Sequence, residues 1–210
     1  MNAPKFSDSP HENEYHLLDF DPGAAATGWA HFCVDFRAFS RPEHKVLRYV
    51  KYWDCGEFTG FETAILKSCV GKIDEVLGLT SYLTMDVMAE DFELTQLIGG
   101  KNLLSPVRIN AVLNWECYRR AIKFSVQARQ LRTNITRERL KLFGFEGKFR
   151  KDEFAAMQHG VVWLRRLKQN SIARPWKLGE GGVLNVKWDC SCSKRRERRP
   201  VPKCDLIHPK

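Results

Sequence analysis

The spacing of apolar residues changes near residue 60, and this change constrains the folds that the chain can adopt. Before it, three runs at residues 15–20, 27–39 and 46–58 are rich in aromatic and β-favouring residues and are separated by turn residues. Such runs predict short strands. From Phe61 to Leu77 the apolar residues instead recur every three or four positions, which predicts a helix.

Strands and helices alternate after this helix. Ser105-Pro106, for example, combines a capping hydroxyl with a proline suited to the first turn, and so predicts a helix start. The later elements are expected in the order strand, helix, strand, short helix and long helix, over residues 86–94, 105–124, 125–131, 136–143 and 152–168. Three strands followed by alternating helices and strands predict an α/β fold with a mixed five-stranded sheet flanked by helices.

The two ends of the chain differ in composition from this central part. Residues 1–14 are polar and predict a flexible tail. Beyond about residue 170 the composition shifts to Gly, Pro, Trp and charged residues. We therefore expect one folded domain over residues 15–170, followed by a basic, cysteine-containing C-terminal extension over residues 171–210.

Several classes of protein are disfavoured by the sequence. It has no run of about 18 or more apolar residues, so we expect no membrane-spanning segment. The N-terminus lacks the apolar core of a secretory signal, and an odd total of seven cysteines argues against a disulfide framework. We expect a cytoplasmic protein, either of a bacterium or, if a phage encodes it, of the infected host.

The formal net charge of +9 is concentrated in two stretches. Residues 119–151 hold eleven Lys or Arg against two Glu, and residues 194–203 hold six basic residues against one acid. Such patches favour a polyanionic partner, most commonly nucleic acid. A solvated basic face is the alternative.

Two acids lie where a sheet could gather them. Nucleases that hydrolyse phosphodiesters with two divalent ions need converging carboxylates, because Mg²⁺ prefers hard oxygen ligands. Asp21 ends the first apolar strand directly before Pro22-Gly23, although an ordinary turn aspartate would look the same. Glu90 follows Val87-Met88-Ala89 inside a predicted buried strand. A carboxylate there is costly without a positive partner such as a metal ion.

A third candidate position lies on the last predicted helix. Asp152 and His159 are seven residues apart, about two helical turns, so they project from one face. Ala155 and Ala156 lie on the same face, and their small side chains would let this helix approach the sheet. An ordinary, partly buried histidine is the alternative for His159.

These residues resemble the motifs of one known family. Leu17-Leu18-Asp19-Phe20-Asp21-Pro22-Gly23, followed by Thr27-Gly28-Trp29, is similar to the first-strand signature of the RuvC-type Holliday junction resolvases. Residues 87–90 resemble the second motif of that family, an apolar strand that ends in a catalytic glutamate. Residues 152–159 occupy the place of its final helix. The resemblance covers about residues 15–168 and implies a ribonuclease H-like fold.

By this resemblance Asp21, Glu90 and Asp152 would be catalytic residues that bind Mg²⁺ or Mn²⁺. The family usually has two acids three residues apart in its last motif, whereas Ala155 follows Asp152 at that spacing. His159 is the substitute that we expect, either as a metal ligand or as a general base. Glu153 is a weaker alternative.

The resemblance also suggests a role for the basic patches. The phosphates of a DNA junction would be held by Lys and Arg side chains, with an affinity that falls as salt rises. A homodimer is implied as well, because a symmetric resolvase cuts two strands. The candidate phosphate-binding residues are Lys101, Arg119, Arg120, Lys123, Arg129, Arg132, Arg137 and Arg139.

The C-terminal extension carries a separate set of candidate ligands. Cys190, Cys192, Cys204 and His208 offer three sulfurs and an imidazole, the ligand set of a structural Zn²⁺ site. The alternative is a flexible basic tail with spare thiols. RuvC-type resolvases generally lack such a segment.

We therefore expect a Mg²⁺-dependent endonuclease that cleaves branched DNA, four-way junctions above all, by a two-metal-ion mechanism. A second hypothesis keeps the enzyme but changes its substrate to flaps, forks or RNA–DNA hybrids. A third hypothesis is a non-catalytic DNA-binding protein on a decayed nuclease fold, which the imperfect last motif favours.

Overall fold

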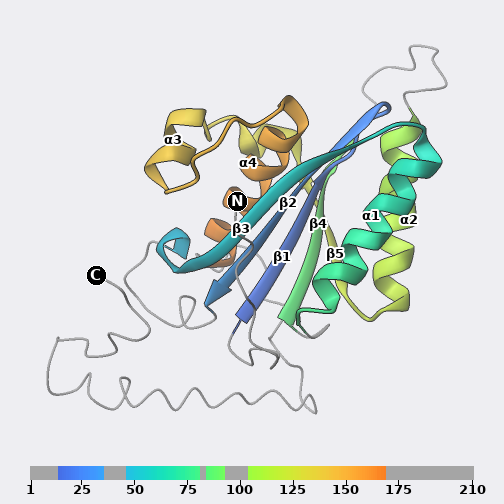
Figure 1. Ribbon diagram of the computed structural model, residues 1–210, viewed down its shortest axis with the longest axis horizontal. Helices are drawn as coiled ribbons and strands as arrows, with labels where there is room; N and C mark the ends of the chain where they lie inside the picture. The colour runs from blue at the N-terminus through green and yellow to red at the C-terminus, as the bar shows by residue number, and fades with distance from the viewer. Residues whose placement is uncertain (1–13, 36–45, 81–83, 93–103, 169–210) are drawn as a thin grey trace, which may run out of the picture. The chain divides into compact units, whose positions relative to one another are not determined.

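Five strands form one mixed sheet in the computed structural model, which describes residues 14–35, 46–80, 84–92 and 104–168. The strands are β1 (Glu14–Asp21), β2 (Ala26–Asp35), β3 (Val50–Thr59), β4 (Met85–Asp91) and β5 (Lys123–Ala128). Their order across the sheet is β3-β2-β1-β4-β5. The first three strands pair antiparallel, whereas β4 is parallel to both β1 and β5 (Figure 1). The predicted mixed five-stranded sheet is thus confirmed.

Helices cover both faces of this sheet. α1 (Glu62–Leu77) and α2 (Ser105–Arg119) lie on one face, and α4 (Lys151–Lys168) packs mainly on β1 and β2 from the other (Figure 1). The remaining described elements are the 3₁₀ turns η2 (Val46–Tyr49) and η5 (Arg129–Arg132) and the short helix α3 (Arg137–Leu142). Within this part of the chain, every helix is too short or too polar to cross a membrane.

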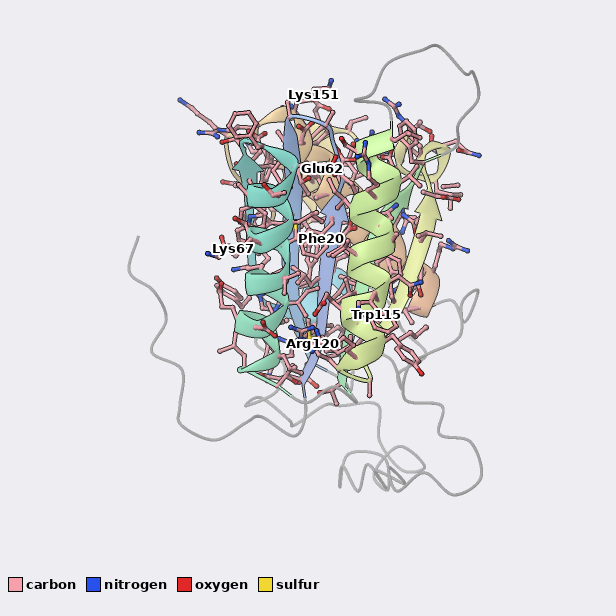
Figure 2. All side chains as sticks on the ribbon, turned by 90° about the vertical axis from the view of Figure 1, so that its right-hand side faces the viewer. Phe20, Glu62, Lys67, Trp115, Arg120 and Lys151 are labelled. Carbon is pink, nitrogen blue, oxygen red and sulfur yellow. The ribbon has the colours of Figure 1, made fainter. Side chains whose placement is uncertain are left out.

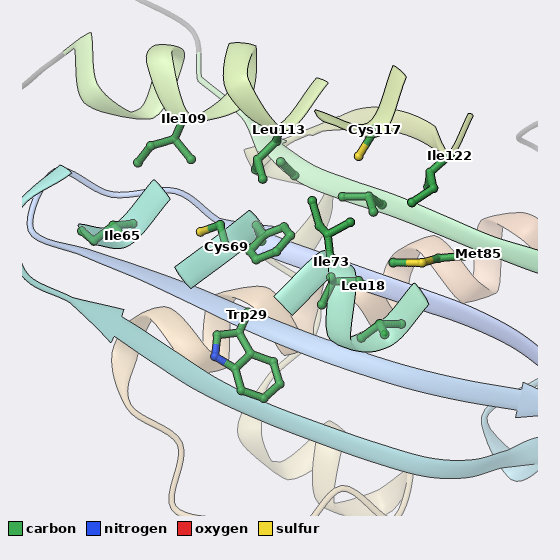
Figure 3. Close-up of a cluster of buried hydrophobic side chains, with 14 residues drawn as sticks. Leu18, Trp29, Ile65, Cys69, Ile73, Met85, Ile109, Leu113, Cys117 and Ile122 are labelled. Carbon is green, nitrogen blue, oxygen red and sulfur yellow. The ribbon is translucent and has the colours of Figure 1, made fainter. Parts of the chain in front are cut away.

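An apolar core lies between the sheet and the α1–α2 pair. Strand alternation directs Leu18 and Phe20 of β1 to this face, and Figure 2 shows Phe20 between the two helices. The predicted helical spacing is confirmed in α1, whose fully buried apolar side chains are Ile65, Cys69, Ile73 and Val76. α2 contributes Ile109, Leu113 and Cys117 from above the parallel strands (Figure 3). This packing holds β1 and β4 side by side.

On the opposite face, Gly28 of β2 lets the start of α4 touch the sheet. A Cβ atom added to Gly28 would lie 2.0 Å from the backbone oxygen of Asp152. No side chain larger than hydrogen fits there without moving one of the two elements. Because Gly28 pairs with Asp21 in the β1–β2 ladder, the contact places the first turn of α4 beside the end of β1.

Small residues continue this contact along α4. A Cβ atom added to Gly160 would lie 2.3 Å from the ring of Phe32 on β2. Ala155 and Ala156 are buried as well, as the sequence predicts for the face that approaches the sheet.

The end of α2 differs from the prediction. The apolar spacing predicts a helix that reaches Phe124, but α2 ends at Arg119. Ala121 has a positive φ of 57°, and the backbone N–H of Ile122 donates to the carbonyl of Cys117. The buried side chain of Ile122 then joins the core. A glycine usually marks such a stop, and none is present here.

Other predicted features differ from the structure or lie outside the described residues. The 3₁₀ turn η2 takes the place of the first residues of the predicted strand at 46–58. Residues 36–39 and 93–94, predicted as strand ends, lie outside the described residues. Of the predicted tail at 1–14, Glu14 is the first residue of β1. The rest of the tail and the boundary near residue 170 lie outside the described residues, so the division into domains stays a prediction.

We expect Gly28→Ala to destabilise the fold. The new methyl group would press on the Asp152 backbone, so the free energy of unfolding should fall by about 1–3 kcal/mol. Gly71→Ala in α1 is the matched control, because a Cβ atom there meets nothing within 4 Å. That helix should gain about 0.5–1 kcal/mol. Urea unfolding followed by circular dichroism measures both changes, and an unchanged midpoint for Gly28→Ala would contradict the close contact.

Candidate metal centre

Asp21 and Glu90 lie side by side at the carboxyl ends of two neighbouring strands. β1 and β4 are parallel, and Phe20 pairs with Ala89. The next residue of each strand, Asp21 or Glu90, therefore lies at the same edge of the sheet. Phe20 and Ala89 face the α1–α2 core, and alternation therefore turns Asp21 and Glu90 towards α4. The structure thus brings these two predicted residues together.

α4 adds His159 to this pair. The Nε2 atom of His159 lies 2.8 Å from Oε2 of Glu90, and the histidine side chain is fully buried. One ligand-type atom from each of Asp21, Glu90 and His159 lies within 4.8 Å of the other two. We call these three residues the acid–histidine cluster.

Gln127 of β5 holds the ring of His159. Its side-chain nitrogen lies 2.8 Å from Nδ1 of His159 and donates to the backbone oxygen of His159 at 3.3 Å. Because a carbonyl can only accept, the amide nitrogen faces the histidine and Nδ1 is an acceptor. The ring proton is therefore on Nε2, which donates to Glu90. Burial lowers the pKa of His159, although Glu90 opposes this, so the ring is a neutral donor that orients the Glu90 carboxylate.

Arg132 of η5 lies between the two carboxylates. Its Nη2 atom is 3.1 Å from Oε2 of Glu90, and its Nη1 atom is 3.7 Å from Oδ1 of Asp21. Only 14% of its side chain is exposed. The neighbouring Arg129 is 71% exposed and reaches Oε1 of Glu90 at 3.8 Å. The sequence suggests phosphate binding for both arginines, whereas Arg132 already neutralises part of the charge of the acid–histidine cluster.

This arginine does not balance the buried acids. Burial and the charge of Glu90 raise the pKa of Asp21 to about 8, although Arg132 partly opposes them. Asp19, two residues earlier on the same face of β1, is fully buried, and among the described residues neither of its oxygens has a side-chain hydrogen-bond partner. Burial and the nearby Asp21 raise the pKa of Asp19 well above its usual value. A cation would be strongly favoured next to these groups.

Glu90 is the acid that the surrounding side chains keep ionised. Burial alone would raise its pKa, but the hydrogen bond from His159 and the charge of Arg132 outweigh burial, and the pKa of Glu90 is lowered. Two neighbouring carboxyl groups therefore have pKa values that are displaced in opposite directions. Such a separation is typical of functional sites.

Asp152 lies next to the acid–histidine cluster but is not one of its three residues. Its backbone rests on Gly28, and its charge helps to raise the pKa of Asp21. Its carboxylate is not among the atoms that lie within 4.8 Å of one another. Glu153 has a different role, because its Oε2 accepts a hydrogen bond of 2.8 Å from the backbone N–H of Arg150 and so caps α4.

The sequence does not reveal the contributions of Gln127 and Arg132. Gln127 is 1% exposed. The sequence hints at its role only by placing a polar residue in a predicted strand. Arg132 belongs to the basic stretch at 119–151, in which nothing distinguishes a guanidinium group that points inward. Asp19 is recognisable as a neighbour of Asp21 on the same strand face, but its complete burial is not.

The predicted phosphate-binding residues separate into two groups. Arg119 and Arg120 end α2, and Figure 2 shows Arg120 at the opposite end of the sheet from Lys151, where α4 begins. Lys123, the first residue of β5, lies at the same far end. Arg120 donates to Asp74 at 2.8 Å, so part of its charge is neutralised within the protein.

The second group lies nearer the start of α4. Arg129 follows β5 directly, and Arg137 donates to the backbone oxygen of Phe149 and stacks its guanidinium 4.6 Å from the ring centre of Phe154. Arg139 donates to the backbone oxygen of Asn134 at 2.6 Å. All three arginines are exposed.

The remaining predicted site residues lie outside the described residues. They are Lys101 and the possible zinc ligands Cys190, Cys192, Cys204 and His208. The roles suggested for them stay predictions.

The strand order, the helices on both faces and the strand directions define the class of fold, which is ribonuclease H-like. Within that class the chain is similar to RuvC of Thermus thermophilus, with a TM-score of 0.51 and 9% identity over 74% of this chain and 96% of that one. A T. thermophilus RuvC structure in complex with Holliday junction substrate matches with a TM-score of 0.49 and 10% identity, over 74% and 95% of the two chains. No family model and no curated protein sequence matches. The likeness confirms the predicted fold.

We expect Asp21→Asn to raise the melting temperature of the metal-free protein, more at pH 8 than at pH 5. The pKa of Asp21 is about 8 in the fold but about 3.9 in an unfolded chain. The unfolded chain therefore ionises this group first, and the wild-type fold loses stability as pH rises from about 4 to 8. Asparagine removes this loss, so the melting temperature in EDTA at pH 8 should rise by at least about 3 °C.

Asp74→Asn is the control for this substitution. Asp74 pairs with Arg120 at the far end of the sheet, and 54% of its side chain is exposed. Its replacement should leave the melting temperature almost unchanged, or lower it slightly, at both pH values. If Asp21→Asn is no more stable than the wild type at pH 8, the fold does not raise the pKa of the Asp21 carboxyl.

Proposed function

We propose that this protein is a metal-dependent endonuclease that hydrolyses phosphodiesters in branched DNA, with four-way junctions as its main substrate. The observation that carries this proposal is the meeting of Asp21 and Glu90 beside a buried histidine, at the carboxyl edge of two parallel strands. Two adjacent, partly buried carboxylates have no structural advantage of their own. The likeness to RuvC adds support by analogy of fold.

The donor atoms of the site suit Mg²⁺ or Mn²⁺, which prefer oxygen ligands and keep several waters. Asp21 and Glu90 would hold a pair of ions, and Asp152 would complete the site from α4. The raised pKa of Asp21 and the unpaired carboxylate of Asp19 indicate that the protein alone supplies too little positive charge. Ions bound here would activate the attacking water and neutralise charge on the scissile phosphate.

The other side chains of the site act on the carboxylates. His159 donates to Glu90, which keeps that group ionised and fixed in direction. Gln127 fixes the ring of His159 from behind. Arg132 contacts both acids and offsets part of their repulsion. In this arrangement His159 is a positioning residue, because direct binding of an ion would require the proton on Nε2 to leave.

The chain's basic character favours DNA as the partner. The exposed Arg129 and Arg137 lie closer to the acid–histidine cluster than Arg119 or Arg120 do, so phosphates would approach from the carboxyl edge of the sheet. A homodimer would allow two symmetric cuts in one junction. α2 exposes a row of apolar side chains that could serve as its interface, namely Leu104, Val107, Trp115 and Tyr118.

We expect Asp21→Asn and Glu90→Gln to abolish cleavage of a four-way junction in Mg²⁺ while both keep its binding. Outer-shell changes at metal sites already cost about 10–100-fold, so loss of a ligand should lower the single-turnover rate by more than about 100-fold. Asp74→Asn, the same chemical change at the far end of the sheet, should retain the wild-type rate. Gel electrophoresis of labelled junctions measures product, and gel shifts in Ca²⁺ measure binding.

Cleavage and binding assays that compare four-way junctions with flaps, forks and RNA–DNA hybrids separate the three hypotheses. Faster cleavage of flaps, forks or RNA–DNA hybrids than of junctions would change the substrate and keep the enzyme. Tight junction binding with no product in Mg²⁺ or Mn²⁺ would favour the non-catalytic protein. Undiminished cleavage by Asp21→Asn would refute the site itself.

We expect Arg129→Ala to weaken junction binding more than Arg119→Ala. Both arginines are largely exposed, at 71% and 59%, but only Arg129 lies at the carboxyl edge. Removing one phosphate contact should reduce the slope of log K against log salt by about 0.9. Fluorescence anisotropy at several KCl concentrations measures this slope. A larger effect of Arg119→Ala would place the DNA at the other end of the sheet.

A further inference from the structure

A second group of ligand-type side chains lies on the other face of the sheet, at the opposite end of β1. His16 of β1 pairs with Cys33 of β2, and Glu14 precedes His16 by two residues on the same strand face. One ligand atom from each of the three lies within 4.8 Å of the other two. All three residues are buried, with exposures of 7% for Glu14, 2% for His16 and 3% for Cys33.

A neighbouring histidine holds the ring of His16. Its Nδ1 atom is 3.0 Å from Nε2 of His31, and the two rings stack with centroids 5.2 Å apart. This leaves Nε2 pointing towards the carboxylate of Glu14, with Oε2 at 3.8 Å. Among the described residues Nε2 has no hydrogen-bond partner. A buried nitrogen in that state is costly, whereas a ligating histidine normally has its other nitrogen held by a neighbour.

Glu14 is oriented by a neighbour as well. Lys51 of β3 donates to its Oε1 at 3.0 Å. The lysine side chain is 42% exposed, so the ammonium group can remain in contact with solvent while it holds one oxygen. The other oxygen, Oε2, is the one that faces His16. Each of the two residues thus directs a polar atom into the group, and the Cys33 thiol is itself hydrogen-bonded to Glu14.

We propose that Glu14, His16 and Cys33 form a second metal site, selective for Zn²⁺ or another borderline-soft divalent transition ion. A thiolate, an imidazole and a carboxylate are the donors that zinc uses, and the sulfur makes the set unsuitable for Mg²⁺. Ligand atoms of a tetrahedral zinc ion lie about 3.3–3.8 Å apart, given bonds of about 2.0–2.3 Å. The His16 and Glu14 atoms, 3.8 Å apart, already lie at such a separation, and no pair in the group exceeds 4.8 Å. An ion here would fasten the start of β1 to the end of β2.

The test uses Co²⁺ as the probe in the full chain, with Cys190, Cys192 and Cys204 replaced by serine so that the C-terminal thiols cannot contribute. We expect a near-ultraviolet thiolate-to-Co²⁺ band that Zn²⁺ abolishes and Mg²⁺ does not. The acid–histidine cluster contains no sulfur and gives no such band. Cys33→Ser should remove the band, whereas the control Cys55→Ser, at a half-buried thiol outside this group, should keep it.

Zinc should also raise the melting temperature of the same tail-substituted chain by roughly 5–10 °C at about 100 times its dissociation constant. If Cys33→Ser does not fold, X-ray absorption of the zinc-loaded, tail-substituted chain replaces it, and one sulfur with nitrogen or oxygen neighbours is the expected shell. Absence of the thiolate band, its survival in Cys33→Ser, or a shell without sulfur would overturn the proposal. None of these results depends on nuclease activity.

Discussion

The burial of Asp21 and Glu90 next to each other is the constraint around which one face of this protein is built. Both carboxylates are partly buried, and both end strands that the apolar core holds side by side. Arg132 contacts both acids, and His159 donates to one of them, yet the pKa of Asp21 is still raised to about 8. A fold selected for stability alone would replace one of the acids by a neutral side chain. Their position next to each other is the arrangement that a cation bound between them would favour.

The backbone, rather than the side chains, brings the histidine into this site. Gly28 and Gly160 remove the two Cβ atoms that would hold α4 away from β2. With the helix so close, one ring nitrogen of His159 reaches Glu90 on the face of the sheet that α4 covers, and the other meets Gln127 on the neighbouring strand. The Asp152 backbone sits on Gly28 for the same reason, which brings an additional negative charge near Asp21. Gly28 of β2 and the small residues of α4 are thus required for the site in addition to its acids.

The sequence predicts the sheet and the convergence of acids because both depend on periodicity. Alternation along β1 and β4 is enough to place Asp21 and Glu90 on one face, and helical spacing is enough to place His159 on the side of α4 that faces the sheet. Interactions set by tertiary packing are not predictable in this way. Arg132 and Arg120 look alike as members of one basic stretch, but the first turns inward to the acids while the second pairs with Asp74, 46 residues away. The end of α2 cannot be predicted from the sequence either, because Ala121 adopts a left-handed conformation that alanine rarely adopts.

The same alternation separates two kinds of donor along β1. Asp19 and Asp21 face α4, whereas Glu14 and His16 face the side of α1 and α2 and lie at the other end of the strand. The first position offers only hard oxygens beside a histidine whose proton is committed to Glu90. The second offers a sulfur and an imidazole nitrogen that has no hydrogen-bond partner among the described residues. Because ions are sorted in cells largely by donor type and geometry, the proposed magnesium-type site and the proposed zinc-type site on this one strand would not compete for the same ion. The strand's period of two provides this separation directly, since neither site can borrow a ligand from the opposite face of the sheet.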